Sequence, residues 1–199
     1  MRNNIRLVAC ALLTAASPMT QAFEAGDSLM RIGIHDVMPK SDNHDTLDVQ
    51  STAGLTVSAE YFLHPQWAID LLVAAPFEHD VELNGTEVAS TMHLPPTLSL
   101  VWYPPIGGNW HPYIGVGANY TFFFNEETTG PIQGQNLELD PSFGVAALVG
   151  IDWDINRQWG VALDVRYMDI DTDGELNGAS LGTFEIDPTV IGIAASYRF

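Results

Sequence analysis

Cysteine is almost absent from this sequence, with one residue in 199, Cys10. It lies in an N-terminal apolar stretch that has the features of a secretory signal peptide. Leu7-Val8-Ala9-Cys10 superficially resembles a lipoprotein acylation box, but the apolar run continues past the cysteine, which favours a later cut. The chain beyond the signal therefore has no disulfide, no thiol nucleophile and no cysteine metal ligand.

The signal peptide is predicted over residues 1–22. Arg2 and Arg6 give it a positive start, a short apolar run follows, and Thr20-Gln21-Ala22 provides a small-residue cleavage site. We therefore predict an exported protein that is cleaved after this site, with a single domain over residues 23–199.

Basic residues are also scarce. The chain has seven Lys and Arg against 25 Asp and Glu, a net charge of −18, and loss of the two signal arginines would bring this to −20. Such a chain repels phosphate groups, so we predict no nucleic acid partner. A content of 46% apolar residues is too high for a disordered chain.

Long apolar runs and helical periodicity are missing beyond the signal. No stretch of about 18 uncharged apolar residues remains, which excludes a membrane-spanning helix. Instead, apolar residues recur at every second position, the period of a β-strand. Eight such segments are found, at about 29–38, 55–61, 67–74, 97–102, 114–122, 143–153, 159–168 and 191–199.

The connections between these segments alternate in length. Tight turns are expected at 64–66 and 154–158 and a moderate one at 104–112, whereas long, mostly polar or acidic loops are expected near 39–51, 77–94, 125–141 and 172–187. This alternation is typical of an all-β, eight-stranded antiparallel up-and-down transmembrane β-barrel with short periplasmic turns and long extracellular loops.

A soluble barrel with an apolar interior would show the same periodicity, so the soluble and membrane barrels must be distinguished by the residues on the polar face. A water-facing surface should carry many charged residues. The polar positions here are mostly Gly and Ala, which suit a narrow eight-stranded interior. The sparse charges among them are able to pair inside the barrel: Glu60, Asp70, Asp152, Asp164, Arg166 and Arg198.

Aromatic residues lie at both ends of the apolar face, as in the interfacial girdles of outer-membrane barrels. Trp67, Trp153 and Trp159 lie beside the short turns, and Phe122 and Tyr167 lie toward the long loops. We predict that this face contacts outer-membrane lipid.

The chain ends in "TVIGIAASYRF", an apolar stripe with its last members at Tyr197 and Phe199. We predict that this last strand closes the barrel. A terminal aromatic residue also matches the signal that the outer-membrane insertion machinery reads.

Several stretches in order resemble the OmpW family of outer-membrane proteins, from about Leu71 to Phe199: "LLVAAPFEH", "HLPPTLSLVWY", "HPYIGVGANYTFFF", "INRQWGVALDVRYMDIDT" and the final "YRF". The resemblance implies an eight-stranded barrel with an unusually apolar lumen. It also implies a passive route for small hydrophobic molecules through the lipopolysaccharide layer.

Two inward positions bear on that lumen. Leu72 matches a place where the resemblance implies an apolar constriction, although a leucine that simply fills the interior is an equally good interpretation. Arg166 is a departure, because the resemblance implies a large aromatic residue there. Paired with Asp70, Asp152 or the surroundings of Asp164, it would plug the lumen with charge.

Three prolines flank one long loop: Pro76 at the end of one strand, and Pro95 and Pro96 at the start of the next. Proline donates no backbone hydrogen bond, so these residues should interrupt the sheet. We predict a lateral opening there, near the extracellular end, through which an apolar solute reaches the membrane. The alternative is that the prolines only terminate the strands.

Motifs for chemistry are weak. "DIDTDGE", from Asp169, resembles a calcium loop but places Ser180 where a glutamate is required, so no metal is assigned. His79, Asp80, Ser90 and His93 share one loop, yet no nucleophile motif fixes their geometry. We predict no enzyme activity and no cofactor.

Three functions stay open on these grounds. The first is an outer-membrane channel for small hydrophobic solutes. The second is a closed structural or receptor barrel whose acidic loops bind divalent cations, lipopolysaccharide or external partners. The third, a lipid-modifying enzyme at the rim, would depend on His79 or His93.

Overall fold

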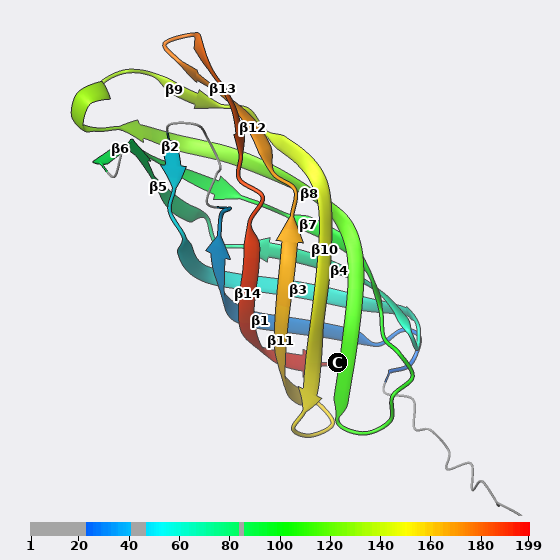
Figure 1. Cartoon of the computed structure of the whole chain (residues 1–199). Helices are drawn as coiled ribbons and strands as arrows, with labels where there is room; N and C mark the ends of the chain where they lie inside the picture. The colour runs from blue at the N-terminus through cyan, green and yellow to red at the C-terminus, as the bar shows by residue number, and fades with distance from the viewer. Residues whose placement is uncertain (1–22, 41–46, 84–85) are drawn as a thin grey trace, which may run out of the picture.

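The computed structural model describes residues 23–40, 47–83 and 86–199. The predicted signal peptide lies outside the described residues. Eight antiparallel strands form a closed barrel (Figure 1): β1 Ser28–Met38, β3 Thr52–His64, β4 Trp67–Ala74, β7 Thr97–Trp102, β8 Trp110–Thr128, β10 Ser142–Asp154, β11 Trp159–Met168 and β14 Thr189–Arg198.

The barrel is closed by its first and last strands. β1 pairs with β14 from Leu29 opposite Arg198 to Met38 opposite Thr189, and each further neighbour is the next barrel strand in sequence. The predicted up-and-down barrel is confirmed, and the last strand closes it as predicted. Such closure leaves no free sheet edge along these strands.

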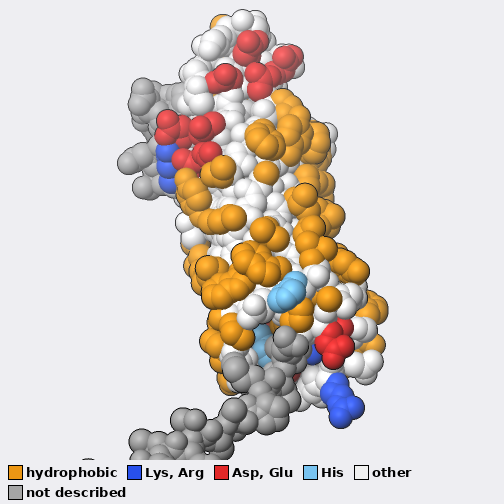
Figure 2. Space-filling model, turned by 90° about the vertical axis from the view of Figure 1, so that its right-hand side faces the viewer, with side chains coloured by type: hydrophobic (Ala, Val, Ile, Leu, Met, Phe, Trp, Pro, Cys, Tyr) orange, Lys and Arg blue, Asp and Glu red, His pale blue; other side chains and the backbone are white. Residues whose placement is uncertain are grey.

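The apolar face points outward. Val116 is 67% exposed and Val149 53% exposed, although both lie well inside long strands. A water-soluble barrel would bury such residues, so a lipid-facing exterior is the arrangement that fits. Figure 2 shows this apolar surface along the barrel, with acidic side chains gathered over its upper end. The predicted girdle residues are also on the outside, each 42–51% exposed: Trp67, Trp153, Trp159, Phe122 and Tyr167.

The segments predicted as long loops are largely strands. They form an extension beyond the barrel wall at the end opposite the short turns (Figure 1), made of β2 Leu47–Val49, β5 Phe77–Leu83, β6 Thr86–Leu94, β9 Leu137–Leu139, β12 Asp171–Leu176, β13 Ala179–Glu185 and the far end of β8. A single turn of 3-10 helix at Gly130–Ile132 is included. Across the described part of the chain, no helix is both long and apolar enough to cross a membrane.

The extension is held to the barrel by β8, which runs from the barrel wall into it, and by further strand pairing. β5 and β6 form a hairpin, β6 pairs with the far end of β8, and β2 pairs with β5. β12 pairs with β13 and with β9 in a separate small sheet. The interior of the barrel therefore continues into a walled space above it.

Small residues allow neighbouring strands of the barrel to pack closely. A Cβ atom added at Gly117 would lie 2.2 Å from the carbonyl oxygen of Leu98 and 2.7 Å from the Cα atom of Ser99. Both are backbone atoms of the paired strand β7, which cannot move aside as a flexible side chain would.

We expect Gly117→Ala to destabilise the barrel by about 1–3 kcal/mol, the usual cost of overpacking. The measurement is the urea midpoint of the refolded protein in lipid vesicles, followed by tryptophan fluorescence. Gly107→Ala is the matched control, because nothing lies within 4 Å of a Cβ atom placed there. Equal midpoints for the two variants would contradict the close approach of β7 and β8.

Candidate functional site

The short-turn end of the barrel is filled by aromatic rings. Phe23 is 1% exposed and stacks on Phe62 with ring centroids 4.1 Å apart. Tyr103 meets Phe23 edge-on at 4.9 Å, and the guanidinium of Arg198 lies 4.3 Å from the centre of the Phe23 ring. This end of the lumen is therefore tightly packed.

Above the rings lies a layer of buried ionic groups around Arg31. Its Nη1 atom donates to Glu60 Oε2 at 2.6 Å, and its Nε and Nη2 atoms donate to the two oxygens of Asp152 at 3.1 and 2.7 Å. Nη2 also donates to the hydroxyl of Tyr103 at 2.7 Å. Sequence analysis missed Arg31, although it shares the inward face of β1 with His35.

Arg166 forms the second half of this ionic layer. Its Nη1 atom donates to Asp70 Oδ2 at 3.1 Å and its Nε atom to Asp164 Oδ1 at 2.8 Å. His35 Nε2 lies 3.2 Å from the other oxygen of Asp164. Arg166 pairs with two of the predicted carboxylates, whereas Asp152 is held by Arg31. Two arginines thus face four carboxylates across the lumen, all of them buried.

Leu72 lies inside the barrel and is 3% exposed. It borders a cavity of only about 10 Å³ together with Phe77, His93, Pro95 and Met168. The space beside Leu72 is therefore small and lined mostly by apolar side chains, and a constriction at this residue stays a prediction.

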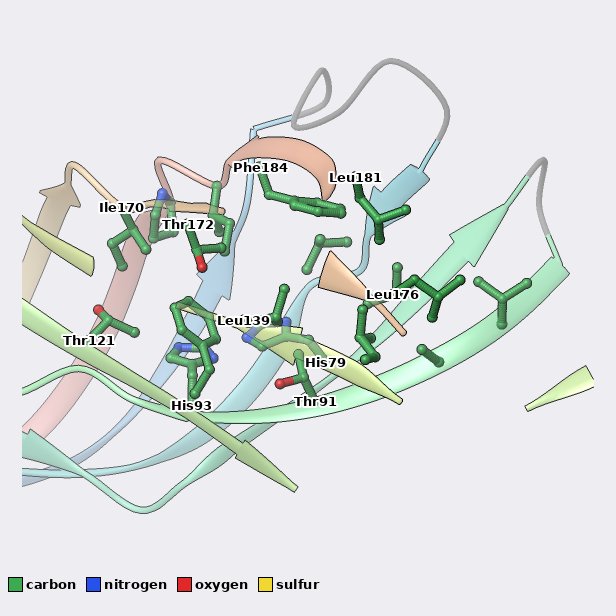
Figure 3. A pocket seen from close by; sticks show the side chains of 18 of the residues that line it. His79, Thr91, His93, Thr121, Leu139, Ile170, Thr172, Leu176, Leu181 and Phe184 are labelled. Carbon is green, nitrogen blue, oxygen red and sulfur yellow. The ribbon is translucent and has the colours of Figure 1, made fainter. Parts of the chain in front are cut away.

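A much larger cavity of about 380 Å³ lies within the extension (Figure 3). Strands β5, β6, β8, β9, β12 and β13 contribute to its wall, with aliphatic and aromatic side chains that include Val81, Val88, Leu137, Ile170, Leu176 and Phe184. The polar members are few, among them His79, Thr91, His93, Thr121 and Thr172. This size and lining suit a small apolar molecule.

The predicted proline site coincides with a break in the backbone ladder. β4 pairs with β7 as far as Leu72 opposite Thr97, and the β5–β6 hairpin begins at Phe77 opposite His93. Between these pairs, residues 73–76 and 94–96 form no ladder pair with each other in the described chain. We call this unpaired stretch the seam.

The backbone groups of the three prolines point in different directions relative to the seam. Backbone groups of successive strand residues point to opposite neighbours. The N–H of Ala75 donates to Leu55 on β3, so the backbone nitrogen of Pro76 points toward the seam. The carbonyl of Pro96 accepts from Tyr120 on β8, so Pro96 points away from the seam, and the carbonyl of Pro95 accepts from the side chains of Thr97 at 3.1 Å and Asn119 at 3.2 Å.

The residues considered for a rim enzyme are not assembled into a catalytic group. His79 lines the cavity, whereas Asp80 is exposed and paired with Ser90 on the opposite face of the β5–β6 hairpin. Asp80 and Ser90 are therefore directed away from the two histidines.

The calcium-like segment is a strand, β12, rather than a loop. Within the described residues, one acidic group has ligand atoms close enough to share a cation: Asp169, Asp171 and Asp187, all within 4.8 Å of one another. Partial burial and the neighbouring charges of Asp187 and Asp169 raise the pKa of Asp171. Lys40 donates to Asp187 at 3.2 Å and partly offsets this charge.

Comparisons with known proteins agree with this architecture. The sequence model of the OmpW family matches residues 24–199. Outer membrane protein W of Escherichia coli is 36% identical, covering 98% of this chain and 99% of that protein. The Dibenzothiophene metabolism operon protein PahQ of Pseudomonas aeruginosa is 28% identical over 76% of this chain and 74% of its own length.

Solved structures give the same result. The crystal structure of OprG from Pseudomonas aeruginosa superposes with a TM-score of 0.79 at 32% identity, covering 90% of this chain and 98% of that one. The solution structure of E. coli outer membrane protein W superposes with a TM-score of 0.65 at 35% identity, covering 88% and 99%. Outer-membrane barrels have short periplasmic turns and longer extracellular loops, so the short turns lie on the periplasmic side and the extension on the extracellular side. This chain belongs to the OmpW family of outer-membrane β-barrel proteins.

Proposed function

We propose that this protein is a passive channel through which small hydrophobic molecules cross the lipopolysaccharide layer and enter the outer membrane sideways. The observation that carries the proposal is the contrast between two levels of the lumen. An apolar cavity of about 380 Å³ lies on the extracellular side, and a layer of buried ion pairs lies below it.

The ionic layer makes straight passage to the periplasm unfavourable for an apolar solute. Such a solute would have to separate Arg31 and Arg166 from their carboxylates, and breaking a buried pair costs several kcal/mol. An apolar molecule has no groups that could replace those interactions. A solute in the cavity therefore needs another exit.

The seam provides that exit at the correct height. It lies beside Leu72 and Pro95, where the narrow part of the lumen meets the cavity, and it adjoins the lipid-facing surface of the barrel. Transfer of apolar surface from water to lipid gains about 25 cal/mol per Å², so no energy source is required.

The name of one relative points to the same chemistry. PahQ is described as a dibenzothiophene metabolism operon protein, and dibenzothiophene is an apolar aromatic compound. We extend to this chain only the general class, small apolar molecules. The remaining proposed partners are outer-membrane lipid, lipopolysaccharide and the insertion machinery, to which Phe199 is accessible with 72% of its surface exposed.

The second candidate is a closed receptor or structural barrel that binds divalent cations or lipopolysaccharide through its acidic extension. The proximity of Asp169, Asp171 and Asp187 favours it. It makes a different prediction for transport, because a closed barrel accelerates the uptake of no solute.

We expect Gram-negative cells that produce this protein to take up a small apolar compound faster than cells without it. Uptake of a polar compound of matching size should not change. The measurement is the initial uptake rate of both compounds in the two strains. Faster uptake of neither compound would favour the receptor barrel.

We expect Pro76→Ala to reduce the uptake of the apolar compound severalfold. The substitution restores an N–H donor that points toward the seam, so the ladder is able to extend across it. Pro96→Ala is the matched control, because its backbone faces β8 and its uptake rate should stay at the wild-type level. A wild-type uptake rate in correctly folded Pro76→Ala would contradict an exit at the seam.

We expect Arg166→Ala to lower the free energy of unfolding by about 3–5 kcal/mol, because Asp70 and Asp164 lose their buried partner. Ion conductance in planar bilayers should stay low, since the Arg31 pairs remain in place. Arg157→Ala, at an exposed turn, is the control. A large conductance in Arg166→Ala would show that this residue alone closes the lumen.

A further inference from the structure

Two polar side chains in the wall of the apolar cavity have unused hydrogen-bonding capacity. His79 is 3% exposed and Thr91 is 5% exposed, and both line the cavity. Neither His79 Nε2 nor Thr91 Oγ1 has a hydrogen-bond partner within the described chain. Leaving a buried polar atom unpaired costs about 1–3 kcal/mol, so such atoms often mark a binding function.

The hydrogen bond made by Nδ1, the second ring nitrogen of His79, determines whether Nε2 donates or accepts. Nδ1 lies 2.5 Å from the carbonyl oxygen of Gln50, and a carbonyl only accepts, so Nδ1 carries the proton. Burial lowers the pKa of the ring, which favours the neutral form. Nε2 therefore presents a lone pair to the cavity and accepts a hydrogen bond from a donor.

Thr91 lies directly opposite His79 in the β5–β6 hairpin. Side chains at such opposed positions have Cβ atoms about 4.5–5.5 Å apart, so one small group is able to reach both. A threonine hydroxyl both donates and accepts. Figure 3 shows His79 and Thr91 close together on the same side of the cavity.

A stack of aromatic rings adjoins this polar pair. The ring of His93 stacks on His79 with centroids 4.7 Å apart and an angle of 17°, and on Phe77 at 5.5 Å. Phe123 lies on another side of His93, 6.1 Å away. A planar aromatic molecule is able to pack against such a wall through its face or edge.

The geometry points to a selective binding site: we infer that the cavity prefers small apolar molecules that carry one hydroxyl group, with phenols as the best match. The hydroxyl hydrogen is donated to His79 Nε2, Thr91 contacts the hydroxyl oxygen, and the hydrocarbon part fills the apolar remainder. This inference rests on the proposed channel function and specifies the class of its solutes.

Two of the other cavity hydroxyls, on Thr121 and Thr172, do not compete for this role, and the third, on Ser180, belongs to an exposed residue. Thr121 Oγ1 donates to Asn119 Oδ1 at 2.7 Å, and Thr172 Oγ1 donates to the carbonyl of Asp140 at 2.6 Å. Both line the same cavity, but their protons are already used. Thr121 therefore supplies a matched control for Thr91.

The test compares 2-naphthol with naphthalene, which differ by one hydroxyl group. Their binding to the full barrel in lipid nanodiscs is measured at pH 7, with empty nanodiscs as the reference for partition into lipid. We expect the protein to favour 2-naphthol over naphthalene by about tenfold, the scale of one hydrogen bond. His79→Phe keeps a ring in the stack and should abolish this preference, Thr91→Val should reduce it, and Thr121→Val should retain it.

A second measurement covers the case in which His79→Phe does not fold. In the unmodified protein labelled with ¹⁵N-histidine, 2-naphthol should shift the Nε2 resonance of His79, and naphthalene should leave it in place. Equal affinity for both compounds, with no shift at Nε2, would overturn the preference for hydroxyl groups while leaving the channel intact. Binding of neither compound would overturn the channel as well.

Discussion

The closed backbone ladder is the constraint on which the rest of this structure depends. Lipid offers no hydrogen-bond partners, so each peptide group of a spanning strand must be paired within the sheet. Pairing of β1 with β14 satisfies that requirement around the barrel. It also leaves the narrow interior to be filled by side chains. Any opening in the wall must therefore occur where pairing is interrupted, and the interruption lies beside the prolines above β4 and β7.

The two levels of the interior follow from this narrowness. In the membrane-spanning part, walls lined with Gly and Ala leave space for Arg31 and Arg166 to extend inward and meet carboxylates from other strands. Buried arginines must be paired, so the same contacts that hold them also close the lumen. Above the membrane, water solvates the outer faces of the extension, and its inner faces supply the apolar cavity.

Strands and faces were predictable because their period of two is a local property. For Arg166, the sequence predicted a group of candidate carboxylates but not which of them it contacts. Asp70 lies 96 residues away, and whether the two meet depends on the register of all the strands between them. Arg31 was missed because the alternation of the first strand is weak, with Asp36 on its outward face and Leu29 and Val37 on its inward face. The β5–β6 hairpin was wrongly predicted as a loop. His79 and His93 lie on its buried face, and because histidine counts as a polar residue, they hide the alternation that indicates a strand.

The same two histidines place a limit on how strongly the cavity should hold a solute. A channel must bind well enough to draw a molecule from water and weakly enough to release it into lipid. In a purely apolar cavity, the hydroxyl group of a solute loses its hydrogen bonds to water and gains none in return, which costs about 1–3 kcal/mol. One acceptor at His79 Nε2 offsets that cost without creating a deep trap, because a neutral hydrogen bond contributes only about 0.5–1.5 kcal/mol net. A charged residue at this position would bind hydroxyl groups more tightly and delay their release through the seam.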